Sequence, residues 1–130
     1  MKYSLILSVV LLAVPAAAQD TSPQALLEAF AAEAGAAPSP DNGRALFLAT
    51  HDGGKPDTPS CITCHTADPT AGGQARTGKP IDPLAPRVNP ARFTDTAFVE
   101  KWFGRNCNSV LGRDCSAQEK ADIISWLVSL

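Results

Sequence analysis

The sequence predicts an all-α fold of about four to five helices, and three observations lead to this expectation. Apolar residues recur at helical spacing in several segments, and most of these segments begin with Ser, Thr or Asp residues that can cap a helix. No alternation of strands and helices is visible. The segments between are rich in proline and glycine and include one C-x-x-C-H motif, so the helices must be arranged around what this motif binds.

The start of the chain has the pattern of an export signal. Lys2 is followed by an apolar run over residues 5–14 and by small residues up to Ala18. The apolar run is too short to cross a bilayer. We therefore expect a signal peptide over residues 1–18, cleaved after Ala18, and one mature domain over residues 19–130. Such a protein would lie in a bacterial periplasm, peripheral to the membrane at most.

The composition argues against two classes of partner. Without Lys2, the chain has ten Lys and Arg residues against 13 Asp and Glu, a net charge of −3. No basic patch points to nucleic acid, and no further apolar stretch points to membrane insertion. The mild acidity would steer a partner with a basic docking face, more strongly at low salt.

Two helices are expected before the motif. The first covers residues 24–34, because Thr21-Ser22-Pro23 supplies a capping hydroxyl and a first-turn proline. Its apolar face comprises Leu26, Leu27, Phe30 and Ala31. The second should run from about Asp41 to Thr50. Its inward residues are Gly43, Leu46 and Phe47, and a glycine four residues before an aromatic lets another helix cross closely.

The segment after the motif, from Thr66 to Arg92, contains five prolines and should be extended chain and turns. Its expected inward residues are Ile81, Leu84 and Val88. Thr94 and Asp95 then cap a helix that should end at about Gly104. The apolar residues of this helix are Phe98, Val99, Trp102 and Phe103.

The last helix begins at a capping box formed by Ser116 and Glu119 and runs to the C-terminus. Its apolar face comprises Ile123, Ile124, Trp126 and Leu127.

The C-x-x-C-H motif, Cys61 to His65, is typical of covalent haem attachment. Two thiols three positions apart can add across the two vinyl groups of a haem, and the imidazole supplies an axial ligand to the iron. A thioredoxin-like pair would open a helix after a strand, and a zinc half-site would need a second close pair of ligands. We therefore predict one haem c, bound covalently by Cys61 and Cys64 with His65 as the proximal iron ligand.

The other two cysteines are Cys107 and Cys115. In an oxidising compartment, a disulfide between them is the default expectation. The chain-entropy model assigns about 2.5 kcal/mol to a loop this short. The bond would restrain residues 106–115. The alternative, that it only stabilises a loop and has no role in the site, is also compatible with the sequence.

The second axial position of the iron decides between an electron carrier and a gas binder. Methionine is the usual strong ligand in small cytochromes c, but the only methionine is Met1, which the expected signal cleavage would remove, so we expect no methionine ligand. His51 allows a bis-histidine arrangement, although a solvated loop histidine is the simpler interpretation. A lysine would have to lose its proton and its hydration, and the candidates Lys55, Lys79, Lys101 and Lys120 are more simply interpreted as surface charges. An amide oxygen from Asn106 or Asn108 would be a weak, easily displaced ligand, and an empty or water-filled position is equally compatible with the residues.

The run Gly104 to Cys115, which reads G-R-N-C-N-S-V-L-G-R-D-C, closely resembles the sphaeroides haem protein family, high-spin cytochromes c of purple bacteria. The resemblance extends over Gly53–Ser60, Thr77–Lys79, Pro83–Pro86, Arg92–Asp95 and Val99–Phe103, and so over essentially the whole mature chain. It implies a class I cytochrome c-like fold around one haem c. In class I cytochromes c the N-terminal and C-terminal helices cross at a glycine and aromatic contact, for which Gly43, Phe47 and Trp126 are the candidates.

The same resemblance implies roles for the site residues. Asn106 would be the distal iron ligand of the oxidised protein, beside the disulfide of Cys107 and Cys115. In this family the asparagine leaves the iron on reduction, which opens a site for oxygen, nitric oxide or carbon monoxide. Members of this family are associated with a dihaem cytochrome c and a membrane cytochrome b as electron donors, so the resemblance implies the same partners here.

Three functions are compatible with these features. The first is a periplasmic haem protein that binds diatomic gases after reduction, with redox activity toward oxygen or nitric oxide left open. The second is a simple electron-transfer cytochrome c with incidental gas binding. The third is a gas sensor or scavenger. The 112 residues expected after cleavage leave no room for a fused output domain, which argues against signalling by this chain alone.

Overall fold

The computed structural model describes residues 19–130, so the expected signal peptide over residues 1–18 lies outside the described residues. This part of the chain forms five helices and one short hairpin, which confirms the all-α prediction. Their bounds are α1 (Pro23–Ala34), α2 (Pro40–Leu48), α3 (Ile62–His65), β1 (Gly73–Gln74), β2 (Pro80–Ile81), α4 (Thr96–Leu111) and α5 (Ala117–Ser129). None of the helices within residues 19–130 combines the length and apolar character needed to span a bilayer.

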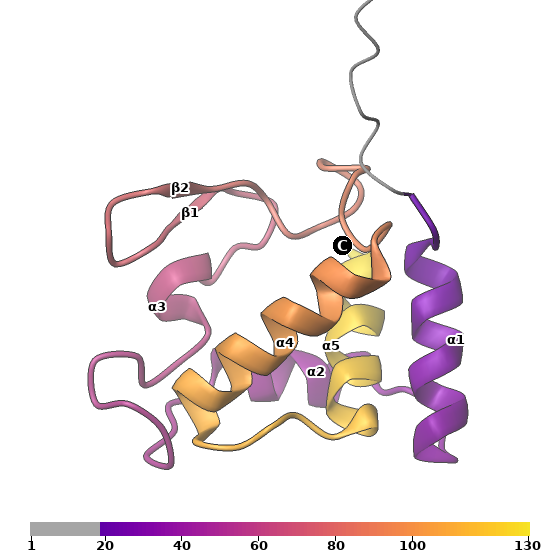
Figure 1. Cartoon of the computed structure of the whole chain (residues 1–130), viewed down its shortest axis with the longest axis horizontal. Helices are drawn as coiled ribbons and strands as arrows, with labels where there is room; N and C mark the ends of the chain where they lie inside the picture. The colour runs from indigo at the N-terminus through magenta and orange to yellow at the C-terminus, as the bar shows by residue number, and fades with distance from the viewer. Residues whose placement is uncertain (1–18) are drawn as a thin grey trace, which may run out of the picture.

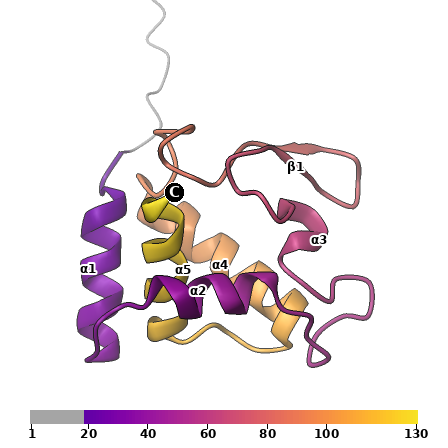
Figure 2. The same ribbon diagram turned by 180° about the vertical axis from the view of Figure 1, so that it is seen from behind.

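The four longer helices form one packed group, and the one-turn helix α3 and the hairpin stand beside it (Figure 1). Helix α1 lies along α5, while α4 crosses α5 on one side. Seen from behind, α2 crosses α5 on the other side (Figure 2). The strands β1 and β2 are antiparallel, with Gly73 opposite Ile81 and Gln74 opposite Pro80.

Helix α5 is the centre of the core. Ala121 and Ile124 are completely buried and pack with the apolar faces of α1 and α4. The neighbouring face of α5 packs against Phe47 of α2. Burial of one such large apolar side chain contributes about 2 kcal/mol. The residues that make up the two core clusters are Leu26, Phe30, Val99, Ala121 and Ile124, and Phe47, Ile123, Trp126 and Leu127.

The predicted crossing of the second and last helices is confirmed. Gly43 is buried, and a Cβ atom at this position would collide with the backbone carbonyl of Asp122 on α5. One turn further along α2, the rings of Phe47 and Trp126 pack with their centroids 5.2 Å apart. The absence of a side chain at Gly43 therefore allows the close approach of α2 and α5.

The prediction that the third long helix ends at Gly104 is wrong. Helix α4 continues through Gly104 to Leu111 and ends at Gly112, which has a left-handed φ of 71° and donates its backbone N–H to Asn108 O. A glycine inside a helix costs only about 1 kcal/mol relative to alanine, and tertiary contacts outweigh that cost. The asparagines and Cys107 thus lie on a helix and not in a loop.

The other boundary differences are small. The N-terminal caps are Ser22, Ser39, Asp95 and Ser116, the last as part of the predicted capping box with Glu119. Helix α2 ends at Leu48, two residues before the expected Thr50. Val88 was expected to face inward, but 43% of its surface is exposed, because it lies in a turn that presents both Arg87 and Val88 to solvent.

Candidate haem site

A cavity of about 600 Å³ lies between α4, α3 and the proline-rich segment, and residues of α2 and α5 also line it. This volume is within the range of small-molecule and cofactor pockets. Most of the lining is apolar, and it includes Ile81 and Leu84, as the sequence predicts for these two residues. The helices contribute further apolar side chains, namely Leu46, Phe47, Phe98, Val99, Trp102, Phe103, Val110, Ile123 and Leu127.

The C-x-x-C-H motif forms α3 and its first cap. Cys61 has helical backbone angles and its carbonyl accepts the backbone N–H of His65 at 3.1 Å. This turn places Cys61 and Cys64 three residues apart on one face of the helix. Both thiols are free, and both line the cavity together with His65. The Phe47 ring packs near the imidazole, with centroids 6.1 Å apart.

Burial keeps His65 and Cys61 in their neutral forms at pH 7. Burial, and secondly the charge of Arg92, lowers the pKa of His65 to about 4. The imidazole is therefore neutral at pH 7 and keeps a nitrogen lone pair for a metal. Burial raises the pKa of the Cys61 thiol to about 11, so this sulfur stays a neutral thiol and not the thiolate that binds a free metal ion.

Asn106 lines the same cavity from α4. It follows Val99, Trp102 and Phe103 at helical spacing, and these residues line the cavity as well. The ribbons of α3 and α4 stay apart in both views, so the motif and Asn106 contribute different walls (Figures 1 and 2).

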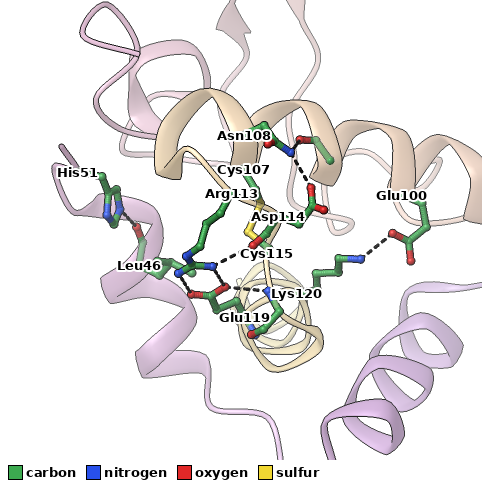
Figure 3. Close-up of a disulfide and its surroundings, with 12 residues drawn as sticks. Leu46, His51, Glu100, Cys107, Asn108, Arg113, Asp114, Cys115, Glu119 and Lys120 are labelled. Atoms are coloured by element: carbon green, nitrogen blue, oxygen red, sulfur yellow. Dashed lines mark hydrogen bonds and ion pairs between the residues drawn. A yellow bond between two sulfur atoms is a disulfide. The ribbon is translucent and has the colours of Figure 1, made fainter. Parts of the chain in front are cut away.

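Three other sequence candidates for the distal position make hydrogen bonds or ion pairs with other residues (Figure 3). The Asn108 amide donates to Gly104 O at 2.8 Å and to Asp114 Oδ1 at 2.6 Å. His51 Nε2 lies 3.0 Å from Leu46 O, and His51 is not among the residues from 19–130 that line the cavity. Lys120 pairs with Glu100 at 2.7 Å, whereas Lys79 does line the cavity.

The predicted disulfide between Cys107 and Cys115 is present. Both cysteines are buried, and the bond joins Cys107, the residue of α4 directly after Asn106, to Cys115 in the connection that precedes α5. With these two sulfurs joined to each other, they do not complete a four-cysteine zinc site with Cys61 and Cys64.

Several cavity residues escape prediction from the sequence. Thr58 and Ser109 contribute hydroxyls, and Arg92 contributes a half-buried guanidinium held by Pro83 O at 2.9 Å and Asp82 O at 2.6 Å. Phe93 has a left-handed φ of 61°, which is uncommon for a bulky residue. These residues come from loops and from the part of α4 that follows its predicted end at Gly104. No periodic apolar pattern in these segments indicates which side chains face inward.

The residues present fit a covalently bound haem. The apolar cavity is large enough and is lined by two free thiols three residues apart, by a neutral imidazole beside them and by the basic side chain of Arg92. A fold of this kind around such a cavity defines a cytochrome c with one haem c. Cys61, Cys64 and His65 are the candidates for its attachment.

Comparisons with known proteins agree with this class. Residues 33–127 match the family described as a domain of unknown function, DUF1924. The cytochrome c-type protein SHP of Cereibacter sphaeroides is 63% identical over 125 residues, which cover 96% of both chains. The chain therefore belongs to the family of the cytochrome c-type protein SHP.

Solved structures are similar in fold as well. The structure of oxidised SHP, described as an oxygen-binding cytochrome c, superposes with a TM-score of 0.83 at 62% identity and covers 85% of this chain and 99% of its own. The solution structure of cytochrome c'' from Methylophilus methylotrophus, solved for the structural basis of haem-ligand detachment, has a TM-score of 0.69 at 38% identity. It covers 83% of this chain and 93% of its own.

Proposed function

We propose that this protein is a periplasmic high-spin cytochrome c in which Asn106 is the distal iron ligand of the oxidised state and is released on reduction, so that oxygen, nitric oxide or carbon monoxide can bind. His65 is the proximal ligand. The observation that carries the proposal is the position of Asn106 on the cavity wall of α4, while the Asn108 amide is engaged outside it.

Ligand chemistry supports the release of Asn106. When bound, the haem supplies an iron that alternates between ferric and ferrous states and takes diatomic ligands in the ferrous state. The amide oxygen of Asn106 is a hard ligand that prefers ferric iron, so an added electron weakens its bond. The oxygen binding described for SHP and the ligand detachment described for cytochrome c'' are consistent with such a labile position.

The wider setting is part of the same proposal. The expected export signal over residues 1–18 would deliver the chain to the periplasm, where the disulfide of Cys107 and Cys115 is stable. A dihaem cytochrome c and a membrane cytochrome b are the proposed electron donors.

The variant Asn106→Ala tests the proposal, with Asn108→Ala as its matched control. In the purified holoprotein, Asn106→Ala should change the ferric optical spectrum while the haem stays covalently bound. It should leave the carbon monoxide affinity of the reduced protein nearly unchanged, because the binding-competent state is already fully populated once the asparagine has left. Asn108→Ala should have the ferric spectrum of the wild type.

Two results would contradict the proposal. A six-coordinate low-spin ferrous spectrum that does not respond to carbon monoxide would mean a permanent strong ligand, and His51 would be the residue to test next. If only Asn108→Ala alters the ferric spectrum, the distal ligand is Asn108 and not Asn106.

A further inference from the structure

We infer that the Ser109 hydroxyl, positioned by Thr58, donates a hydrogen bond to the diatomic ligand bound beside Asn106. This inference rests on the proposed function, because it concerns the ligand that enters when Asn106 is released. It assigns to Ser109 the discrimination between a polarised ligand such as oxygen and a weakly polar one such as carbon monoxide.

The first step is the position of Ser109. It follows Asn106 by three residues in α4, so the two side chains lie on the same face of the helix. Ser109 and Asn106 both line the cavity, and the neighbouring lining residues Val110 and Leu111 are apolar. A hydroxyl in such surroundings exerts a stronger effect than it would in water.

The second step concerns which proton is available. Thr58 Oγ1 lies 3.0 Å from the Ser109 carbonyl oxygen, to which it donates, and 2.7 Å from Ser109 Oγ. A hydroxyl has one proton and two acceptor lone pairs. Because the Thr58 proton is used on the carbonyl, Thr58 Oγ1 acts as an acceptor for the Ser109 proton. That proton can turn to a better acceptor in the cavity without leaving Thr58 unpaired.

The third step is the rigidity of this arrangement. Thr58 is 7% exposed, and the loop that carries it is fixed to the end of α4. The backbone N–H of Lys55 donates to Ser109 O at 2.7 Å, and Gly54 packs directly on the same carbonyl. Carbonyl groups near the C-terminal end of a helix lack hydrogen-bond donors within the helix, and here the loop supplies the donors. The donor is therefore held in place before any ligand enters.

The test compares Ser109→Ala with wild-type holoprotein in the reduced state. Oxygen should dissociate about tenfold faster from the variant, as expected for the loss of one hydrogen bond. Carbon monoxide dissociation should change much less, and the carbon monoxide stretching band should move to higher frequency. Ser125→Ala is the matched control, because its hydroxyl donates to Asp122 O at 2.8 Å on α5 and lies outside the cavity lining.

A second measurement does not depend on the folding of Ser109→Ala. In the wild-type protein, the vibrational bands of the oxygen ligand should shift in D₂O, because the Ser109 proton exchanges. Asn106→Ala should keep this sensitivity and Ser109→Cys, which retains only a weak donor, should lose most of it.

Equal oxygen dissociation rates in Ser109→Ala and wild type would overturn the inference while leaving the proposed function intact. So would a variant that changes only the ferric spectrum, because Ser109 would then act on Asn106 and not on the gas. If reduced wild-type protein binds neither oxygen nor carbon monoxide, the proposed function itself is wrong and the inference falls with it.

Discussion

At the scale of single residues, Gly43 and Gly104 have the same backbone conformation and opposite surroundings. Both lie inside helices. A Cβ atom on Gly43 would overlap the backbone of Asp122 and Ile123, whereas a Cβ atom on Gly104 meets no heavy atom within 4 Å. The first glycine is required by the contact between α2 and α5, and the second only reduces the stability of α4.

We therefore expect Gly43→Ala to lower the free energy of unfolding by about 3 kcal/mol, because α2 must move away from α5. Gly104→Ala should raise it by up to about 1 kcal/mol through higher helix propensity. Chemical denaturation of the two holoproteins measures both changes. A Gly43→Ala protein as stable as the wild type would show that the crossing tolerates a methyl group.

The distinction between Asn106 and Asn108 also belongs to this scale. With 3.6 residues per turn, positions two apart on an α-helix point about 200° away from each other. The sequence places both asparagines beside a disulfide but predicts a loop there, and in a loop this angle is undefined. Once α4 extends to Leu111, one asparagine faces the cavity and the other faces Asp114.

At the scale of elements, the start of α5 combines a capping box with an ion pair. Glu119 Oε2 accepts the backbone N–H of Ser116 at 2.8 Å, and both carboxylate oxygens accept from the Arg113 guanidinium at 2.8 Å. These contacts, with the Arg113 hydrogen bonds as the main cause, lower the pKa of Glu119 below its usual 4.5. The contacts thus tie the segment after α4 to the helix that organises the core.

A carboxyl group whose pKa is lower in the folded state stabilises that state at pH values above its pKa in the unfolded chain. This stabilisation is lost as the pH falls through the pKa of the folded state. Glu119→Gln should therefore reduce the unfolding free energy by about 1 kcal/mol at pH 7. The difference from wild type should shrink below about pH 4.5. Thermal unfolding from pH 7 to pH 3 tests this, with exposed Glu33→Gln as a control that should follow the wild type throughout. A constant difference at all pH values would exclude the charged contact as the cause.

At the scale of the whole molecule, the cavity separates α3 and the proline-rich segment from the helical group. α2 and α5 make extensive contact and α1 packs along α5, while α3 makes its clearest contacts with β1. Apolar walls of a cavity of about 600 Å³ are stabilised only when a hydrophobic group fills it. A haem bound in this cavity would therefore complete the core.

The double variant Cys61→Ala with Cys64→Ala should lose covalently bound haem in a denaturing gel stained for haem. Its melting temperature should fall, and the loss of helical circular dichroism should be partial, because α1 and α2 both pack directly on α5. The double variant Cys107→Ser with Cys115→Ser is the control and should keep the haem attached. Covalently bound haem in the Cys61 and Cys64 double variant would refute the assignment of these two residues as the attachment sites.

The sequence alone determined the all-α class, the presence of the four longer helices, the disulfide pairing and the family, because these depend on spacing along the chain and on residue chemistry. Local patterns also identified the faces of α1 and α5, since apolar periodicity is set by helix geometry. Only the tertiary structure decided the length of α4, the outward position of Val88 and which asparagine faces the cavity. These features depend on contacts between distant segments, such as the loop at Thr58 against Ser109, and such contacts leave no periodic signal in the sequence.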